Sequence, residues 1–280
     1  MKWQGGRRGG VEDRRGMGGP GMIGGGGVVV VILALVGYYV FGIDPQTVVN
    51  GLESIQGSQS QQQASVGTPK DEAGQFVEVV HTSANDTWTA LFQAQGKTYS
   101  PSTVVLYDNA TGTGCGTGQA AMGPFYCPAD QRVYIDLSFW TTLDQQLGAK
   151  GDYARAYVIA HEVGHHVQNQ LGITDYVQQQ ERRVSRSAAN ALSVRLELQA
   201  DCYAGVWAYQ SNLKMNWLEA GDIEEAIGAA SAVGDDTLQE ASQGRVVPDS
   251  FTHGSAADRV KWFKTGFANG DPRQCDTFGA

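Results

Sequence analysis

The chain is poor in positive charge relative to negative charge. Its 280 residues include 20 Lys and Arg against 29 Asp and Glu, a formal net charge of −9. The first 20 residues carry five basic and two acidic side chains, which leaves a net charge of −12 for the rest. A body this acidic argues against nucleic acid as a partner.

Two further signatures are missing. The glycine-rich segment GTGCGTGQAAMGPFYCP is not followed by Lys-Ser or Lys-Thr, so it does not match a phosphate-binding loop. We interpret it instead as an irregular hairpin. The sequence also shows no internal repeat, which leaves one globular body with appendages rather than a repeat array.

One apolar run stands out. Residues 21–43 carry no charge, and with its flanking glycines the apolar stretch reaches the roughly 20 residues that a transmembrane helix needs. Basic residues precede the run and none follows soon, which predicts a single-pass anchor with a cytoplasmic N-terminus. A cleaved signal peptide is the alternative. No A-x-A-like site follows, so we favour an uncleaved anchor.

Composition divides the chain into four parts. Residues 1–20 are a Gly/Arg-rich tail, predicted to be disordered and cytoplasmic. After the anchor at 21–43, residues 44–74 form a Gln/Ser/Gly-rich linker, and residues 75–280 form the globular domain. Within it we expect a helix over 76–95 and strands over 103–107 and 132–137.

The most informative motif is HExxH. His161, Glu162 and His165 lie in a segment with an apolar stripe at helical spacing, from a start near Asp152 to a stop near Gly172. Histidines four residues apart on a helix share a face and can bind one zinc ion, while the glutamate can reach a zinc-bound water. The alternative is a helix with two surface histidines.

A third ligand is expected downstream. The segment SVRLELQADCYAGVWAYQ has helical periodicity, and Glu197 and Asp201 share one of its faces. We assign Glu197 as the zinc ligand and Asp201 as the acceptor for the outer N–H of a zinc histidine. A solvated acidic pair is the alternative. Gln168 and Leu171 stand where the metzincin extension HExxHxxGxxH needs Gly and His, so we do not expect the third ligand to be a histidine of that extension.

His166 follows His165 directly and points about 100° away from it on the helix. We therefore predict that His166 is a structural or surface residue.

Four segments together resemble the neutral zinc metallopeptidases of bacteria, a family of membrane-anchored proteins: HEVGHHVQ, ELQADCYAGVW, GPFYCPADQRVYID and MKWQGGRRGGVEDRRG. The resemblance runs along nearly the whole chain. It implies an α+β, zincin-like domain of the gluzincin kind, mainly helical with a small sheet, preceded by a transmembrane helix.

These observations predict a zinc-dependent metallopeptidase, anchored in a bacterial cell membrane, with its catalytic domain in the periplasm or outside the cell. Its partners would be a peptide or protein substrate and the lipid bilayer. Glu162 would take a proton from the zinc-bound water and pass it to the leaving amine. The alternative is a non-catalytic zincin-fold protein of the envelope that acts through interactions.

Two further parts of the site are expected. His253, which precedes a helix that carries Arg259, is the candidate oxyanion stabiliser, with Tyr126 or Tyr134 as alternatives. Residues 118–122 are the candidate edge strand for pairing with a peptide substrate.

The four cysteines contain no CxxC pair. In a domain outside the cytoplasm this predicts disulfides, with three possible connectivities. Cys115 and Cys127 flank the glycine-rich segment and are the favoured pair, which leaves Cys202 with Cys275. Free buried thiols are the alternative.

Overall fold

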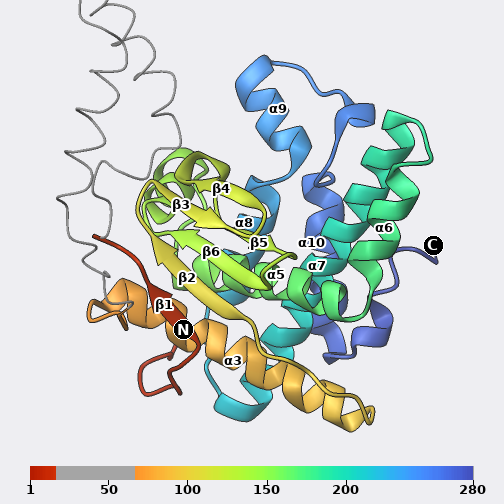
Figure 1. Ribbon diagram of the computed structural model, residues 1–280. Helices are drawn as coiled ribbons and strands as arrows, with labels where there is room; N and C mark the ends of the chain where they lie inside the picture. The colour runs from red at the N-terminus through yellow and green to blue at the C-terminus, as the bar shows by residue number, and fades with distance from the viewer. Residues whose placement is uncertain (17–66, 280) are drawn as a thin grey trace, which may run out of the picture. The chain divides into compact units, whose positions relative to one another are not determined.

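The computed structural model describes residues 1–16 and 67–279 (Figure 1). Residues 1–13 and 67–280 form one compact unit. None of the helices in these described ranges is long and apolar enough to cross a membrane. The predicted anchor at 21–43 and most of the predicted linker lie outside the described residues.

The main sheet has four strands in the order β1-β2-β6-β5. Strands β1, β2 and β6 run parallel to one another, and β5 pairs antiparallel with β6. Four of the five residues in both β2 and β6 are buried, as expected for the central strands of a covered sheet. A separate antiparallel hairpin, β3–β4, carries the glycine-rich segment. The strands are β1 Val11–Asp13, β2 Thr103–Tyr107, β3 Ala110–Thr113, β4 Gly116–Gln119, β5 Phe125–Cys127 and β6 Arg132–Asp136.

Helices make up most of the described unit (Figure 1). Helix α5 is central, because it packs against α3, α7 and α8 and contacts both β5 and β6. The helices are α3 Glu72–Ala94, α4 Phe139–Thr141, α5 Asp152–Gln170, α6 Ile173–Glu181, α7 Arg186–Met215, α8 Asp222–Ala232, α9 Asp235–Gln243 and α10 Ala256–Asn269. The expected mixed fold, mainly helical with small sheets, is confirmed.

Small residues let α10 lie directly on α7. A Cβ atom added at Gly266 would overlap the backbone carbonyl of Cys202, and one at Gly205 would overlap the carbonyl of Phe263. The two helix backbones therefore touch, and only glycine fits at the crossing. This close approach holds the C-terminal half of α7 in the core, where residues 198–208 are all buried.

The predicted disorder of the N-terminal tail is wrong for residues 1–13. Residues 11–13 form β1, the edge strand beside β2, while Met1 and Trp3 are buried. Glycine and arginine content suggested a solvated tail, but the few apolar side chains of this segment all find partners in the domain. The domain also begins earlier than residue 75, with α3 starting at Glu72 and capped by Asp71.

All four cysteines form disulfides in the predicted pairing, Cys115–Cys127 and Cys202–Cys275. Of the predicted edge strand at 118–122, only residues 118–119 are in a strand, at the end of β4 beside β3, while residues 120–122 form a short 3-10 turn. The edge strands of the main sheet are β1 and β5. The HExxH helix, α5, begins at Asp152, as expected, and its N-cap is Gly151.

Candidate metal centre

Three predicted metal ligands converge from two helices. His161 and His165 lie one turn apart on α5, and Glu197 comes from α7. The two Nε2 atoms are 3.1 Å apart. The Glu197 carboxylate lies 3.2 Å from His161 Nε2 and 3.4 Å from His165 Nε2. The packing of α7 against α5 brings Glu197 to the two histidines, although it is distant from them in the sequence.

These separations fit a zinc ion. Zinc–nitrogen and zinc–oxygen bonds of about 2.0–2.2 Å in a tetrahedron place neighbouring donor atoms roughly 3.3 Å apart. The three measured donor separations, 3.1 to 3.4 Å, bracket that value. Two imidazoles and one carboxylate are also the donor set of many catalytic zinc sites.

Each histidine is oriented by a partner on its outer nitrogen. His161 Nδ1 lies 2.9 Å from Asp201 Oδ1, and His165 Nδ1 lies 2.9 Å from Gln168 Oε1. Gln168 is itself held, since its amide donates to Leu196 O at 2.6 Å. Such contacts keep the hydrogen on Nδ1 and leave Nε2 free to bind a metal. Asp201 was expected from the sequence. Gln168 was not, because a single glutamine on a helix gives no signal.

Asp201 is the hub of a buried polar network. Arg259 from α10 donates to it twice, from Nε at 2.8 Å and from a terminal nitrogen at 3.0 Å, and the Tyr157 hydroxyl also donates to it. Burial opposes ionisation, but the Arg259 guanidinium and His161 outweigh it and lower the pKa of Asp201. The carboxylate therefore stays charged inside the protein.

The same carboxylates act on His161. Burial favours the neutral imidazole, but Asp201 and Glu197 outweigh it and raise the pKa of His161 to about 10. Without a metal, a proton on His161 compensates part of the negative charge. A divalent cation would take the place of that proton, which is the behaviour of a metal site.

Glu162 lies beside this centre and is 7% exposed. Burial raises the pKa of its carboxyl above the usual range. Glu162, His161, His165 and Glu197 all line one cavity of about 570 Å³. Its remaining wall is largely apolar, with Phe125, Phe139, Leu147, Val158, Leu196, Val233 and Leu238.

His253 lines the same cavity from the loop before α10. Its ring lies 3.2 Å from Asp235 Oδ1, and Asp235 Oδ2 accepts the backbone N–H groups of residues 252–254. The hydrogen bond to Asp235 raises the pKa of His253. About half of the His253 side chain is exposed.

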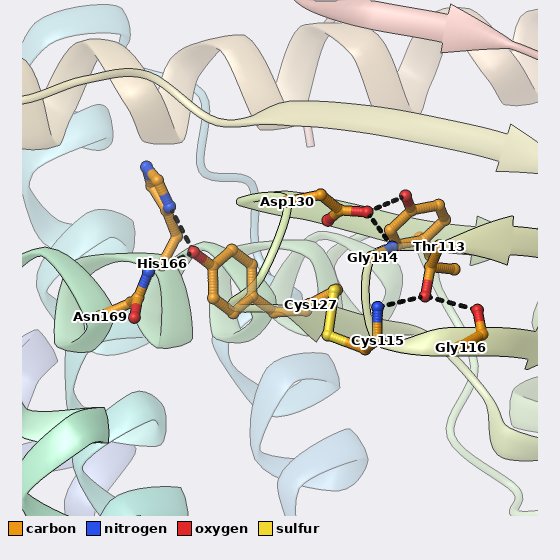
Figure 2. The surroundings of a disulfide bond; sticks show 10 residues. Thr113, Gly114, Cys115, Gly116, Cys127, Asp130, His166 and Asn169 are labelled. Atoms are coloured by element: carbon orange, nitrogen blue, oxygen red, sulfur yellow. Dashed lines mark hydrogen bonds between the residues drawn. A yellow bond between two sulfur atoms is a disulfide. The ribbon is translucent and has the colours of Figure 1, made fainter.

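Strand β5 forms another wall and is fixed from two sides (Figure 2). The Tyr126 hydroxyl lies 2.9 Å from His166 Nδ1 and accepts from Asn169 at 3.0 Å, so it is tied to α5. Cys127 is bonded to Cys115 at the tip of the β3–β4 hairpin. His166 is fully buried and donates to Ser100 O, so its role is structural and not at the surface. Tyr134 is buried in the sheet and does not line the cavity.

A family model described as "Putative neutral zinc metallopeptidase" matches residues 1–278. "Uncharacterized protein YpfJ" of Escherichia coli K12 is 52% identical over 290 aligned positions, which cover 100% of this chain and 99% of the relative. "Uncharacterized protein Rv2575" of Mycobacterium tuberculosis H37Rv is 42% identical over 219 positions, covering 75% of this chain and 73% of the relative.

No solved structure matches the chain. The family is nevertheless clear, since the family model covers nearly every residue and includes both helices that carry the three donors. The chain belongs to the neutral zinc metallopeptidase family.

Proposed function

We propose that the protein is a zinc-dependent peptidase with a zincin-like domain of the gluzincin kind. The observation that carries this proposal is the convergence of His161, His165 and Glu197 at zinc-like donor separations, with Glu162 in the same cavity. Bound zinc supplies a Lewis acid that polarises a carbonyl and lowers the pKa of water.

The chain's own residues would then handle the protons. The Glu162 carboxylate would accept a proton from the attacking water and return it to the amine of the departing peptide. His253, protonated and held by Asp235, would donate a hydrogen bond to the carbonyl oxygen of the substrate as negative charge develops on it.

The substrate we propose is an extended peptide. Among the strands of residues 1–16 and 67–279, β5 pairs with β6 on one side only, and it lines the cavity, so its other edge offers backbone groups to a strand of substrate. The apolar part of the cavity wall favours an apolar side chain next to the cleaved bond.

For the compartment, we propose the bacterial envelope outside the cytoplasm, with residues 21–43 as membrane anchor. Two disulfides support an oxidising compartment. The apolar composition of residues 21–43 supports contact with a lipid bilayer.

The test begins with the full-length chain purified in detergent. We expect close to one zinc per chain and cleavage of casein or an apolar peptide that a chelator stops and added zinc restores. Zinc with no cleavage of any peptide in a broad library would favour the alternative, a non-catalytic zincin-fold envelope protein. Absence of zinc after loading at neutral pH would refute both the peptidase and the non-catalytic zincin-fold protein.

The matched variants are Glu162→Gln and Glu72→Gln. Glu162→Gln keeps the size of the side chain but cannot accept a proton, so turnover should fall by at least about 10²–10⁴-fold while the zinc content stays the same. Glu72 is exposed on α3, and its replacement should change neither property. Retained activity in Glu162→Gln would refute the proton-transfer role.

A further inference from the structure

The N-terminal segment, residues 1–13, binds the domain as a strand with anchoring side chains. β1 pairs with β2 over three positions, and the Gly10 carbonyl accepts the N–H of Val104 at 2.9 Å. The Lys2 N–H donates to Trp217 O at 2.8 Å. Trp3 is 8% exposed and packs edge-on against Phe76 of α3 at 5.4 Å. Met1 and Trp3 are the buried side chains of this segment, and its other residues are half-buried or exposed.

A buried carboxylate of the domain is paired with a cation from this segment. Glu78 on α3 is 3% exposed, and Arg8 donates to its carboxylate at 2.6 Å. Arg8 also donates to Pro69 O at 2.9 Å. Burying a carboxylate is costly unless a cation or several donors compensate it. Arg8, which precedes the segment 14–66, therefore compensates the charge of Glu78, which follows that segment.

The two ends of that segment also meet. Asp13 N donates to Gly67 O at 2.9 Å, and Gly67 N donates to Asp13 O at 3.3 Å. The chain therefore leaves the unit after residue 13 and rejoins it at residue 67 beside the point of departure, whatever residues 14–66 do in between.

We infer that residues 1–13 lie on the same side of any membrane as residues 67–279. A single crossing between residues 14 and 66 would put β1 and β2 on opposite sides of the bilayer and separate Arg8 from Glu78. If residues 21–43 enter a bilayer, as their composition predicts, segment 14–66 must return to the side from which it left. The inference conflicts with the predicted single-pass anchor, which would put the tail and the domain on opposite sides, and it does not depend on peptidase activity.

Cysteine labelling of the full chain in spheroplasts tests the shared compartment. Gln4 and Lys264 are exposed, and the native cysteines are all in disulfides. A membrane-impermeant maleimide should react with Gln4→Cys and Lys264→Cys to the same extent. Equal labelling in intact spheroplasts places both outside the cytoplasm; equal protection until lysis also supports a shared side. Labelling of one position with protection of the other would overturn the inference.

Charge reversal tests the packing itself. Arg8→Glu should lower the melting temperature of the full chain by about 5–15 °C, because a second carboxylate then faces the buried carboxylate of Glu78 in place of a cation. Arg7→Glu is the control in the same segment, since Arg7 pairs with Asp86 at the surface and is 65% exposed; its loss should be about 2 °C or less. In a Glu78→Gln background, Arg8→Glu should cost less than half as much. The inference would be overturned if Arg7→Glu and Arg8→Glu lowered the melting temperature equally, or if Arg8→Glu kept its full effect in the Glu78→Gln background.

Discussion

At the scale of single residues, the site is governed by one buried carboxylate. Asp201 is fully buried, yet it stays charged because Arg259, Tyr157 and His161 all point hydrogens at it. The charge of Arg259 is thereby used to hold a carboxylate that in turn orients a metal ligand. Removal of the Asp201 charge would leave a guanidinium buried without its counterion, which is costly.

Asp201→Asn should therefore weaken zinc binding. An asparagine fills the space but loses the charge, so His161 is held less firmly and donates less electron density. We expect zinc affinity to fall about 10–100-fold, measured by competition with a coloured chelator. Asp175→Asn, an exposed change on α6, is the control. Unchanged affinity in Asp201→Asn would show that Asp201 serves folding alone.

The pair His253 and Asp235 gives a pH dependence with a definite sign. The folded pKa of His253 is raised above 6.5, so the pair's contribution to stability is complete below pH 6.5 and is lost as pH rises through that folded value. The hydrogen bonds that Asp235 accepts from His253 and the following residue lower its pKa despite burial, so its contribution is present above pH 3.8 and is lost as pH falls through the lower folded value. The ion pair is thus complete between these limits.

Asp235→Asn tests this argument. The amide still accepts the backbone N–H groups of the loop but removes the charge, so the His253 pKa should fall toward 6.5. Titration of the His253 ring protons by NMR measures this directly. If His253 must be protonated for turnover, the alkaline limb of the rate profile should move to lower pH by the same amount. A shifted pKa with an unmoved rate profile would remove His253 from the mechanism.

At the scale of helices and strands, the site depends on how closely α10 lies on α7. Gly266→Ala should destabilise the protein by roughly 1–3 kcal/mol, because a methyl group there must push two helix backbones apart. Gly228→Ala on α8 is a matched control, since a Cβ there meets nothing within 4 Å and should stabilise by up to about 1 kcal/mol. Urea unfolding measures both. Equal effects would mean that the crossing is not tightly packed.

Sequence patterns predicted the elements that carry their own periodicity. The strands at 103–107 and 132–137 were predicted from their β-branched and aromatic residues and are present at 103–107 and 132–136, and the HExxH helix was predicted because apolar residues repeat along it. β1 and β5 were missed. Each has only three residues and is defined by its neighbour across the sheet, not by its own pattern. The same limit applies to Gln168, whose role follows from a contact with Leu196 on another helix.

At the scale of the whole molecule, the two disulfides serve different parts. Cys202–Cys275 joins residues 73 apart and lies one residue beyond Asp201. The chain near Cys275 is also held to α7, since Gln199 donates to Cys275 O and Thr277 donates to Arg195 O. Cys115–Cys127 joins residues 12 apart and ties the hairpin to β5.

Their removal should therefore have different consequences. Loop-closure entropy predicts a loss of about 4 kcal/mol for Cys202→Ser/Cys275→Ser and about 3 kcal/mol for Cys115→Ser/Cys127→Ser. The second variant releases the wall of the cavity, so it should raise KM for a peptide substrate more than it lowers kcat, while its zinc content stays the same. The first loosens the helix that carries Glu197, so it should weaken zinc binding. Wild-type protein in reductant should show both losses together. Loss of zinc in Cys115→Ser/Cys127→Ser with zinc retained in Cys202→Ser/Cys275→Ser would contradict these roles of the two disulfides.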